Sequence, residues 1–148
     1  MPASESGETF PSETEFRALA AFRSTLRRFL AFSEQAAANV GLTTQRYQAL
    51  LVIKTYPGGE HISVGQLAAE LMIKEHSAAE MVSRLVQAKL VRRKTDPTDR
   101  RRSLVVLTAS GERCLSHLAS VHLCELRKSE SAFLDLFNAA KDEPLTTS

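Results

Sequence analysis

The most constraining feature of this chain is a pair of short strands on either side of a turn crowded with positive charge. Residues 90–94 and 104–107 have the composition of β-strands, and an Asp-Pro step favours a turn between them. That turn carries Arg100, Arg101 and Arg102. We therefore predict a β-hairpin wing with a basic tip, and a nucleic-acid backbone is the negative partner that such a projection favours.

Positive charge is concentrated locally and does not characterise the chain as a whole. The 148 residues are 43% hydrophobic and 24% charged, with a net charge of only +2, which is ordinary for one globular domain. Between residues 84 and 102, eight Lys and Arg residues stand against two Asp, a local excess of six positive charges. This block predicts a polyanionic partner. Its basic members are Arg84, Lys89, Arg92, Arg93, Lys94, Arg100, Arg101 and Arg102.

Several other classes of protein find no support in the sequence. Cys114 and Cys124 do not form a Cys-x-x-Cys pair, and we interpret them as packing residues of a helix. Residues 1–15 lack the apolar run of a signal peptide, and no stretch is long enough to span a bilayer. Motifs of phosphate loops, metalloprotease helices and nucleophile elbows are absent. We expect a cytoplasmic protein that is no enzyme and uses no cofactor or metal.

Apolar periodicity predicts a mainly helical chain around the hairpin. Residues 64–72 and 75–89 form two helices joined by a tight junction, the spacing of a helix-turn-helix, and residues 61–63 can pair as a minor strand. The predicted fold class is mainly α with a small β-hairpin wing, a winged helix-turn-helix with long N- and C-terminal dimerisation helices. The helices are expected at residues 15–39, 44–54, 64–72, 75–89 and 108–140, the last as one long helix capped by Thr108.

The domain organisation follows from these elements. We expect an acidic disordered lead, a first dimerisation helix, the DNA-binding part, a last dimerisation helix and a frayed tail, at residues 1–13, 14–42, 43–107, 108–141 and 142–148. Apolar side chains left over on the terminal helices favour a second copy of the chain, and packing within one chain is the alternative. Examples are Phe29, Leu30, Phe133 and Phe137.

The second helix of the pair has the composition of a DNA-recognition helix. One face is apolar, and its first turns present polar side chains suited to base edges and phosphates. An ordinary amphipathic surface helix would show the same pattern, so this helix alone does not decide between the two. The candidate DNA-binding residues here are Lys74, Glu75, His76, Ser77, Glu80 and Arg84.

The wing supplies the sharper candidates. Solvated charge runs usually lie on helices with mixed signs, whereas these arginines precede an apolar strand. Asp99 stands two residues before Arg101 and can hold its guanidinium in a salt bridge, which would orient it toward a narrow minor groove. Arg100 completes the candidate set. A solubilising loop is the alternative interpretation.

These motifs together resemble the MarR family (multiple-antibiotic-resistance regulators) over residues 15–140. The most specific part is an Asp-x-Arg wing followed by Leu-Thr-x-x-Gly. It comprises Asp99, Arg101, Leu107, Thr108 and Gly111. The other matching segments are Gly41-Leu42-Thr43, Gln66-Leu67-Ala68, Val82-Ser83-Arg84-Leu85 and Leu90-Val91-Arg92-Arg93.

The resemblance implies a homodimeric transcriptional regulator, most often a repressor, bound to a pseudo-palindromic operator in double-stranded DNA. Its terminal helices would intertwine, each recognition helix would enter the major groove, and each wing would reach the adjacent minor groove. By position, residues 74–77 and Glu80 start the recognition helix, and Asp99 and Arg101 match the wing pair. The family also implies a small-molecule effector, for which Tyr47 is either a cleft residue or a plain core residue.

Two glutamates depart from the residue types common in that family. A carboxylate at Glu75 or Glu80 repels phosphate but accepts a hydrogen bond from cytosine N4. Glu80 can instead pair with Arg84, four residues on in the same helix. The alternative function, from another class, is a winged-helix protein–protein interaction module without DNA binding.

Overall fold

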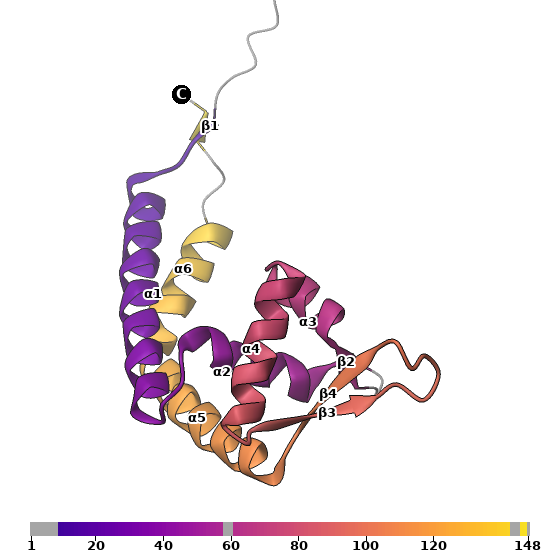
Figure 1. Cartoon of the computed structure of the whole chain (residues 1–148). Coiled ribbons are helices and arrows are strands. Elements are labelled where there is room, and N and C mark those ends of the chain that lie inside the picture. Colours follow the sequence, from indigo (N-terminus) through magenta and orange to yellow (C-terminus); the bar gives the residue numbers. More distant parts are fainter. Residues whose placement is uncertain (1–8, 58–60, 143–145, 148) are drawn as a thin grey trace, which may run out of the picture. The chain divides into compact units, whose positions relative to one another are not determined.

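The computed structural model describes residues 9–57, 61–142 and 146–147. Contacts divide them into two compact units, one formed by the chain up to Phe32 and from Leu123, and one by Ser33–His122. The elements, shown in Figure 1, are β1 (Thr9–Phe10), α1 (Glu13–Asn39), α2 (Thr44–Thr55), β2 (Ile62–Ser63), α3 (Val64–Leu71), α4 (Glu75–Gln87), β3 (Val91–Thr95), β4 (Ser103–Leu107), α5 (Ala109–Lys128), α6 (Glu130–Asp142) and β5 (Thr146–Thr147).

The predicted winged helix-turn-helix is confirmed within the unit Ser33–His122. α3 and α4 form the helix pair, and β3 and β4 form the wing hairpin (Figure 1). β4 is the central strand of an antiparallel sheet with the order β2-β4-β3. The minor strand expected at residues 61–63 is β2, which pairs with β4 through Ile62 opposite Val105.

The prediction of one continuous helix at residues 108–140 is wrong. α5 and α6 are separated at Ser129. The Ser129 N–H donates to the Leu126 carbonyl oxygen, three residues back, at 3.0 Å. Its hydroxyl donates to the Glu125 carbonyl oxygen at 3.3 Å. A serine hydroxyl bonded to a nearby carbonyl competes with the helical ladder, and here it takes the carbonyl that a continuous helix would give to the backbone.

Short strands pair near both ends of the described chain. β1 and β5 are antiparallel partners. They fall within the segments expected to be a disordered lead and a frayed tail, so the structure differs from that expectation at these positions. Residues 1–8, 143–145 and 148 of these segments lie outside the described residues.

The first helix is followed by a glycine that ends it. Gly41 adopts a φ of +77°, in the left-handed region that glycine enters at little cost. The Leu42 N–H then returns to the Ala37 carbonyl oxygen at 2.9 Å. Thr43 caps α2 by accepting the Arg46 N–H at 3.2 Å. The chain therefore leaves α1 and enters α2 with its terminal backbone groups satisfied.

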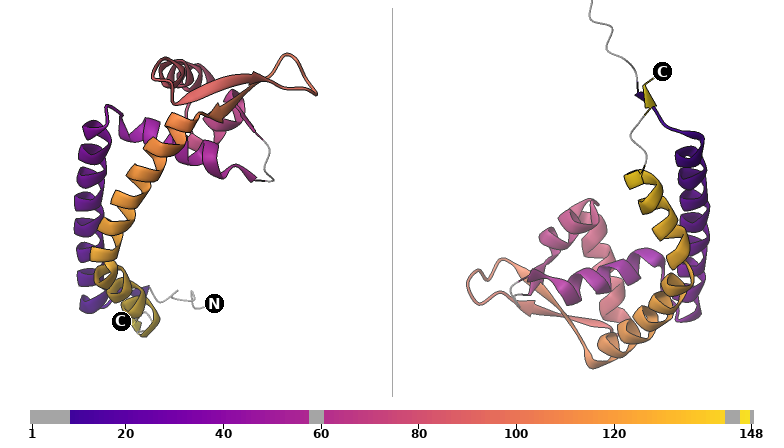
Figure 2. Two further views of the ribbon diagram at one scale, coloured as in Figure 1. Left: turned by 90° about the horizontal axis from the view of Figure 1, so that it is seen from below. Right: turned by 180° about the vertical axis from the view of Figure 1, so that it is seen from behind.

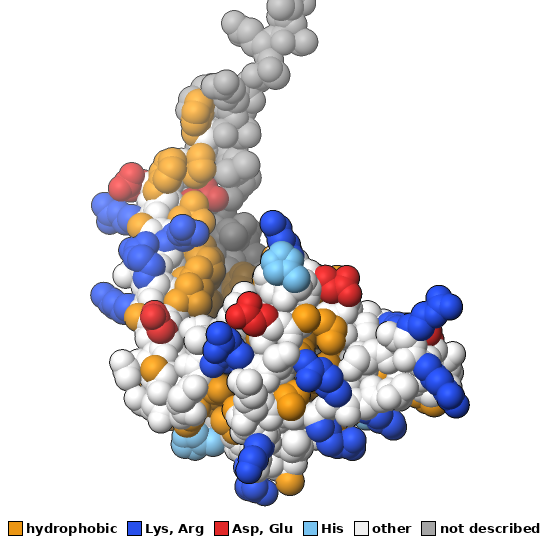
Figure 3. All heavy atoms as spheres, viewed as in Figure 1, with side chains coloured by type: hydrophobic (Ala, Val, Ile, Leu, Met, Phe, Trp, Pro, Cys, Tyr) orange, Lys and Arg blue, Asp and Glu red, His pale blue; other side chains and the backbone are white. Residues whose placement is uncertain are grey.

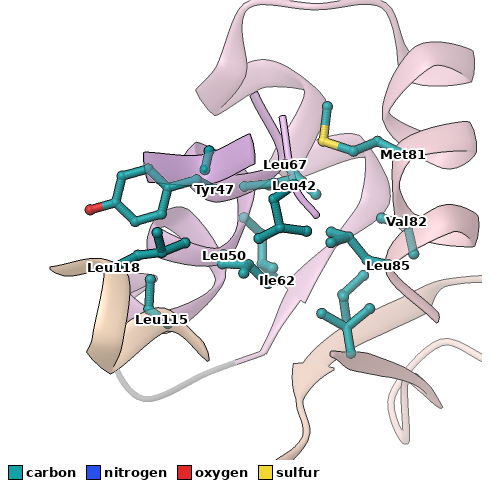
Figure 4. Close-up of a cluster of buried hydrophobic side chains, with 14 residues drawn as sticks. Leu42, Tyr47, Leu50, Ile62, Leu67, Met81, Val82, Leu85, Leu115 and Leu118 are labelled. Carbon is teal, nitrogen blue, oxygen red and sulfur yellow. The ribbon is translucent and has the colours of Figure 1, made fainter. Parts of the chain in front are cut away.

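A hydrophobic core fills the unit Ser33–His122 (Figure 4). Side chains from α2, α3, α4, α5 and the sheet meet in it. Fully burying a Leu or Ile side chain contributes about 1.5–3 kcal/mol, so these contacts are the main support of the helix-turn-helix. The largest fully buried side chains are Leu50, Ile62, Leu67, Leu85, Leu118, Val82, Val91 and Val105.

The two strands of the wing differ in burial. β4 buries Leu104 and Val105, whereas β3 buries Val91 and exposes residues 92–95. β3 is an edge strand of the sheet, and positive charge on an edge strand discourages pairing with other chains. The wing therefore presents its charge to solvent.

The other compact unit places α6 beside the first part of α1 (Figure 2). The rings of Phe22 and Phe133 pack edge to face there, with centroids 5.7 Å apart. Large apolar side chains remain exposed, visible in orange along α1 in Figure 3. Those of this unit are Phe10, Phe16, Leu19, Leu30, Leu123, Leu134 and Phe137. Despite this apolar surface, none of the described helices combines the length and apolar character needed to cross a bilayer.

Candidate nucleic-acid interface

The turn between α3 and α4 fixes where the second helix begins. The Met72 and Ile73 N–H groups return to the carbonyl oxygens of Ala69 and Ala68, at 3.2 and 3.0 Å. Met72 adopts a left-handed φ of 54°. These bonds close the end of α3 in the manner of a Schellman motif, and Lys74 follows as the N-cap of α4.

α4 has one buried face and one open face. Its buried side chains are Ala78, Met81, Val82 and Leu85. The candidate contact residues lie on the open face and at the N-cap. Ser77 is half-buried, and the exposed members are Lys74, Glu75, His76, Glu80 and Arg84. The structure therefore brings this candidate set together along one side of a single helix.

Glu80 and Arg84 form the ion pair that the sequence offered as an alternative. The Arg84 Nη2 lies 3.4 Å from the Glu80 Oε1, and both side chains are more than half exposed. Such a pair contributes about 0.3–0.5 kcal/mol, because solvent screens it. A bond this weak leaves both side chains available to another partner.

Asp99 holds the backbone of the wing tip. Its Oδ1 accepts the Arg101 N–H at 3.0 Å, and its carbonyl oxygen accepts the Arg102 N–H at 3.0 Å. The predicted salt bridge to the Arg101 guanidinium is therefore wrong for this structure. An aspartate side chain is short and readily reaches the N–H two residues on, which forms an Asx turn. Arg100 and Arg101 both lie exposed at this tip.

Asp96 stabilises the base of the same turn, a role that the sequence analysis did not assign. Its Oδ1 accepts the Thr98 hydroxyl at 2.7 Å and the Thr98 N–H at 2.9 Å. These bonds, with a smaller contribution from the nearby Arg102 charge, hold the pKa of the Asp96 carboxyl below its ordinary value. The Asp-Pro-Thr step was the available signal, because aspartate commonly bonds the backbone two residues on.

Two wing arginines are hydrogen-bonded to serines of the helix-turn-helix. The Arg93 Nη2 donates to the Ser83 Oγ at 2.8 Å, and the Arg102 Nη2 donates to the Ser63 Oγ at 3.1 Å. Both arginines border an open groove of about 820 Å³ between α3, α4 and the wing, which Arg101 also lines. Figure 3 shows the Lys and Arg side chains gathered over the wing.

Thr108 joins the wing to α5, as the sequence indicated. Its hydroxyl accepts the Gly111 N–H at 3.0 Å, which caps the helix, and donates to the Lys89 carbonyl oxygen at 2.6 Å. Its N–H donates to the Leu90 carbonyl oxygen at 3.0 Å. One residue thus holds the start of α5 against the link between α4 and β3.

The histidines and cysteines of α5 belong to no group of three or more potential metal ligands in the described part of the chain. His122 is buried, stacks on Tyr47 with ring centroids 4.4 Å apart, and lies 2.7 Å from the Ser33 hydroxyl. Tyr47 is therefore a core residue, and burial raises the pKa of its hydroxyl. Cys114 is half-buried and burial raises the pKa of its thiol, whereas Cys124 is exposed.

The geometry defines a class of protein, the winged helix-turn-helix, with an open-faced second helix and a basic wing bordering one groove. Comparison with known proteins adds a likeness to one family. Residues 40–102 match the model of the MarR family.

Named relatives of the chain include transcriptional regulators. The transcriptional regulator HosA of Escherichia coli O111:H- is 37% identical over 75 residues, 51% of this chain and 53% of that protein. The chain spans about half the length of the curated relatives it matches. AbsC, a MarR family transcriptional regulator from Streptomyces coelicolor, superposes with a TM-score of 0.65 at 26% identity, covering 87% of this chain and 84% of AbsC.

A further solved structure shares the fold. It is a mutant MepR of S. aureus bound to an oligodeoxyribonucleotide, with a TM-score of 0.65 at 19% identity, covering 75% of this chain and 79% of MepR. At this identity the likeness concerns the fold alone.

Proposed function

We propose that this protein is a sequence-specific DNA-binding regulator of transcription. The observation that carries the proposal is the groove bordered by the open side of α4 and by the arginines of the wing, all within one compact unit. A helix that offers polar side chains to base edges and a basic projection that reaches the phosphates are the two parts that such binding needs. The names of HosA and AbsC, both transcriptional regulators, support the same function.

The candidate residues then divide by chemistry. His76, Ser77 and Glu80 face the bases in the major groove, where donors and acceptors distinguish the base pairs. Lys74 and Arg84 at the two ends of this stretch contact phosphates, together with Arg100 at the wing tip. Arg101 enters the minor groove, because Asp99 fixes the backbone from which it projects. Glu75 borders the groove, where its carboxylate either accepts a hydrogen bond from a cytosine or repels a phosphate.

The proposal includes a homodimer that represses transcription from a pseudo-palindromic operator in the cytoplasm. Two-fold symmetry in a protein pairs naturally with two half-sites on DNA. The exposed apolar side chains of the unit containing α6 support dimerisation, since an apolar patch of this kind is normally covered. Of the four residues singled out in the sequence, Leu30 and Phe137 are exposed, and Phe29 and Phe133 are half-buried.

A small aromatic effector that relieves repression belongs to the proposal as well. The family resemblance alone supports this effector. Tyr47, the one candidate for a cleft residue, is part of the core and adds no support. Melting-temperature shifts across a panel of phenolic and aromatic carboxylates measure it directly, since a ligand of the folded state raises the melting temperature. No shift with any compound would remove the effector from the proposal and leave DNA binding intact.

The test of DNA binding is the substitution Arg101→Ala, measured against a duplex selected from a random library by repeated binding. We expect the affinity for DNA to fall at least about tenfold. The salt slope, the steepness with which the logarithm of the affinity decreases with the logarithm of the salt concentration, should fall by about one. The melting temperature should be unchanged. The control is Arg17→Ala, an exposed arginine of α1 paired with Glu13 at 3.3 Å. It should leave DNA binding unchanged.

Two outcomes would contradict the proposal. Unchanged affinity in Arg101→Ala refutes the wing assignment. If the wild-type protein binds no duplex even at about 50 mM salt, where electrostatic binding is strong, the alternative of a protein–protein interaction module replaces DNA binding.

A further inference from the structure

We propose that Arg93 and Arg102 are positioning residues, whose bonds to Ser83 and Ser63 set the place of the wing relative to the recognition helix. The inference rests on the proposed DNA-binding function and deepens it. It separates the arginines of the wing into two groups with different tasks. Arg100 and Arg101 meet the DNA, and Arg93 and Arg102 hold the hairpin from which the first two project.

The first bond joins β3 to α4. Arg93 lies opposite Val105 in the hairpin, on the edge strand, and its Nη2 reaches the Ser83 Oγ at 2.8 Å. The Ser83 hydroxyl donates in turn to the Ala79 carbonyl oxygen, one helical turn back, at 3.1 Å. The hydroxyl hydrogen is thereby directed along α4, and a lone pair remains to accept from arginine. Ser83 is thus oriented as an acceptor for the wing.

The second bond joins the other side of the hairpin to the start of α3. Arg102 directly precedes β4, and its Nη2 reaches the Ser63 Oγ at 3.1 Å. Ser63 is buried, and the same oxygen caps α3 by accepting the Gln66 N–H at 3.2 Å. Each side of the wing is therefore tied to a different helix of the helix-turn-helix.

Two anchors constrain a hairpin more than one. A two-stranded ribbon can swing about its attachment to the sheet, and a single bond would leave a hinge. With both sides held, the tip that carries Arg101 keeps a set distance from α4. Minor-groove and major-groove contacts on one DNA helix require such a set distance, because the two grooves have a defined separation.

A simpler role competes with this one. Arg93 and Arg102 border the groove and carry positive charge, so each could act as a direct phosphate contact that makes no use of its serine. The two roles differ in what the serines do. Removing an uncharged hydroxyl deletes no phosphate contact, yet it releases the anchor.

The experiment is a double-mutant cycle on DNA affinity with Ser83→Ala, Arg93→Ala and the double variant. A charge-assisted hydrogen bond of this kind predicts a loss of about five- to tenfold for Ser83→Ala, at an unchanged salt slope. The double variant should bind no more weakly than Arg93→Ala alone. Arg100→Ala is the matched control, and its salt slope should fall by about one because it loses a phosphate contact.

A second readout concerns the free protein. Backbone NMR order parameters at Arg100 and Arg101 should fall in Ser83→Ala without DNA, whereas a direct phosphate contact would leave them unchanged. Ser83→Thr keeps the hydroxyl and should restore both affinity and order. Ser63→Ala is avoided in this role, because it would also remove the α3 cap.

Each possible outcome either supports or overturns the positioning role. Unchanged affinity in Ser83→Ala, or losses in the double variant equal to the product of the single losses, overturns the positioning role while DNA binding stands. A wild-type protein that binds no DNA overturns both the role and the proposed function. A loss in Ser83→Ala that Ser83→Thr restores, with coupled losses in the cycle, supports the role.

Discussion

Gly111 lies against the backbone carbonyl of Leu90, so closely that a Cβ at position 111 would collide with the carbonyl oxygen. The Leu90 carbonyl carbon would stand 3.0 Å from that Cβ and a methyl carbon of Leu107 3.4 Å. The first turn of α5 therefore packs directly on the link between α4 and the wing. This contact explains a glycine inside a helix, where alanine is otherwise preferred.

We expect Gly111→Ala to lower the free energy of unfolding by about 2 kcal/mol, because overpacking against backbone outweighs the helix propensity of alanine. Denaturant melts at pH 7 provide the measurement. Gly65→Ala, also in a helix, is the matched control, because its Cβ would meet only the Glu75 side chain at 3.7 Å. That variant should gain about 0.5 kcal/mol. A Gly111→Ala protein as stable as Gly65→Ala would contradict the packing argument.

Asp96 should make stability depend on pH in the acid range. Its pKa in the folded protein lies below the ordinary value of 3.8, so its ionised form stabilises the fold above that value. The contribution is lost as the pH falls through the folded pKa. We expect Asp96→Asn to melt at a lower temperature than wild type near pH 7, and the difference to disappear as the pH falls below the ordinary value and through the folded pKa.

The variant Thr98→Val supplies the control for that effect, because Thr98 provides the largest cause of the shift through its hydroxyl. When Asp96→Asn is introduced into the Thr98→Val protein, the pH-dependent change in melting temperature that it causes should be smaller than in wild type. A melting-temperature difference that stays constant from neutral to acid pH would rule out ionisation as the cause.

Met72 combines a left-handed backbone with a side chain that is 91% exposed. A residue other than glycine pays about 1 kcal/mol for this conformation, and an exposed side chain returns little in packing. Met72→Gly relieves this strain, but glycine also raises the conformational entropy of the unfolded chain, which offsets part of the gain. We therefore expect the free energy of unfolding to stay the same or to rise by up to about 0.5 kcal/mol. Met72→Ala retains the strain and should be no more stable than wild type in the same urea titration.

Glu75 should limit binding to unrelated DNA. Its carboxylate borders the groove that Arg93 and Arg101 also line, where a phosphate would meet repulsion. Removing one such repulsion is worth roughly 1 kcal/mol in water, so Glu75→Gln should bind an unrelated duplex about fivefold more tightly. Fluorescence anisotropy at two salt concentrations measures the change.

A selected duplex then distinguishes two roles of Glu75. If the carboxylate accepts from a cytosine amino group, Glu75→Gln should weaken binding to that duplex while strengthening binding to the unrelated one. Glu13→Gln serves as the comparison, because Glu13 is an exposed glutamate of α1 paired with Arg17 and is not among the candidate contact residues. If Glu75→Gln binds each of the two duplexes with the same affinity as the wild-type protein, Glu75 has no part in DNA selection.

Local signals in the sequence were sufficient for most of the fold. Gly41 and the caps at Thr43, Ser63 and Thr108 act through bonds spanning a few residues, and they mark helix ends at the expected places. The break at Ser129 was missed because a lone serine inside an apolar periodic stretch has no distinctive pattern.

The site was harder to anticipate, because its bonds join distant parts of the chain. The anchors at Arg93 and Arg102 have partners 10 and 39 residues away, beyond any local pattern. The spacing between Asp99 and Arg101 allowed the aspartate to accept either from the Arg101 backbone N–H or from the Arg101 guanidinium. In the structure it accepts from the backbone N–H. Assigning bases or phosphates to the residues of α4 stays a prediction, since the sequence gives their face and not their partner.

The shared acceptor at Ser63 has a consequence for local unfolding. One oxygen holds both the Gln66 amide and the Arg102 guanidinium, so fraying of the first turn of α3 also loosens the wing. A DNA molecule that immobilises the wing should therefore protect the Gln66 amide from hydrogen exchange through the shared Ser63 oxygen. Binding of DNA at the wing would then be measurable as slower amide exchange in the first turn of α3.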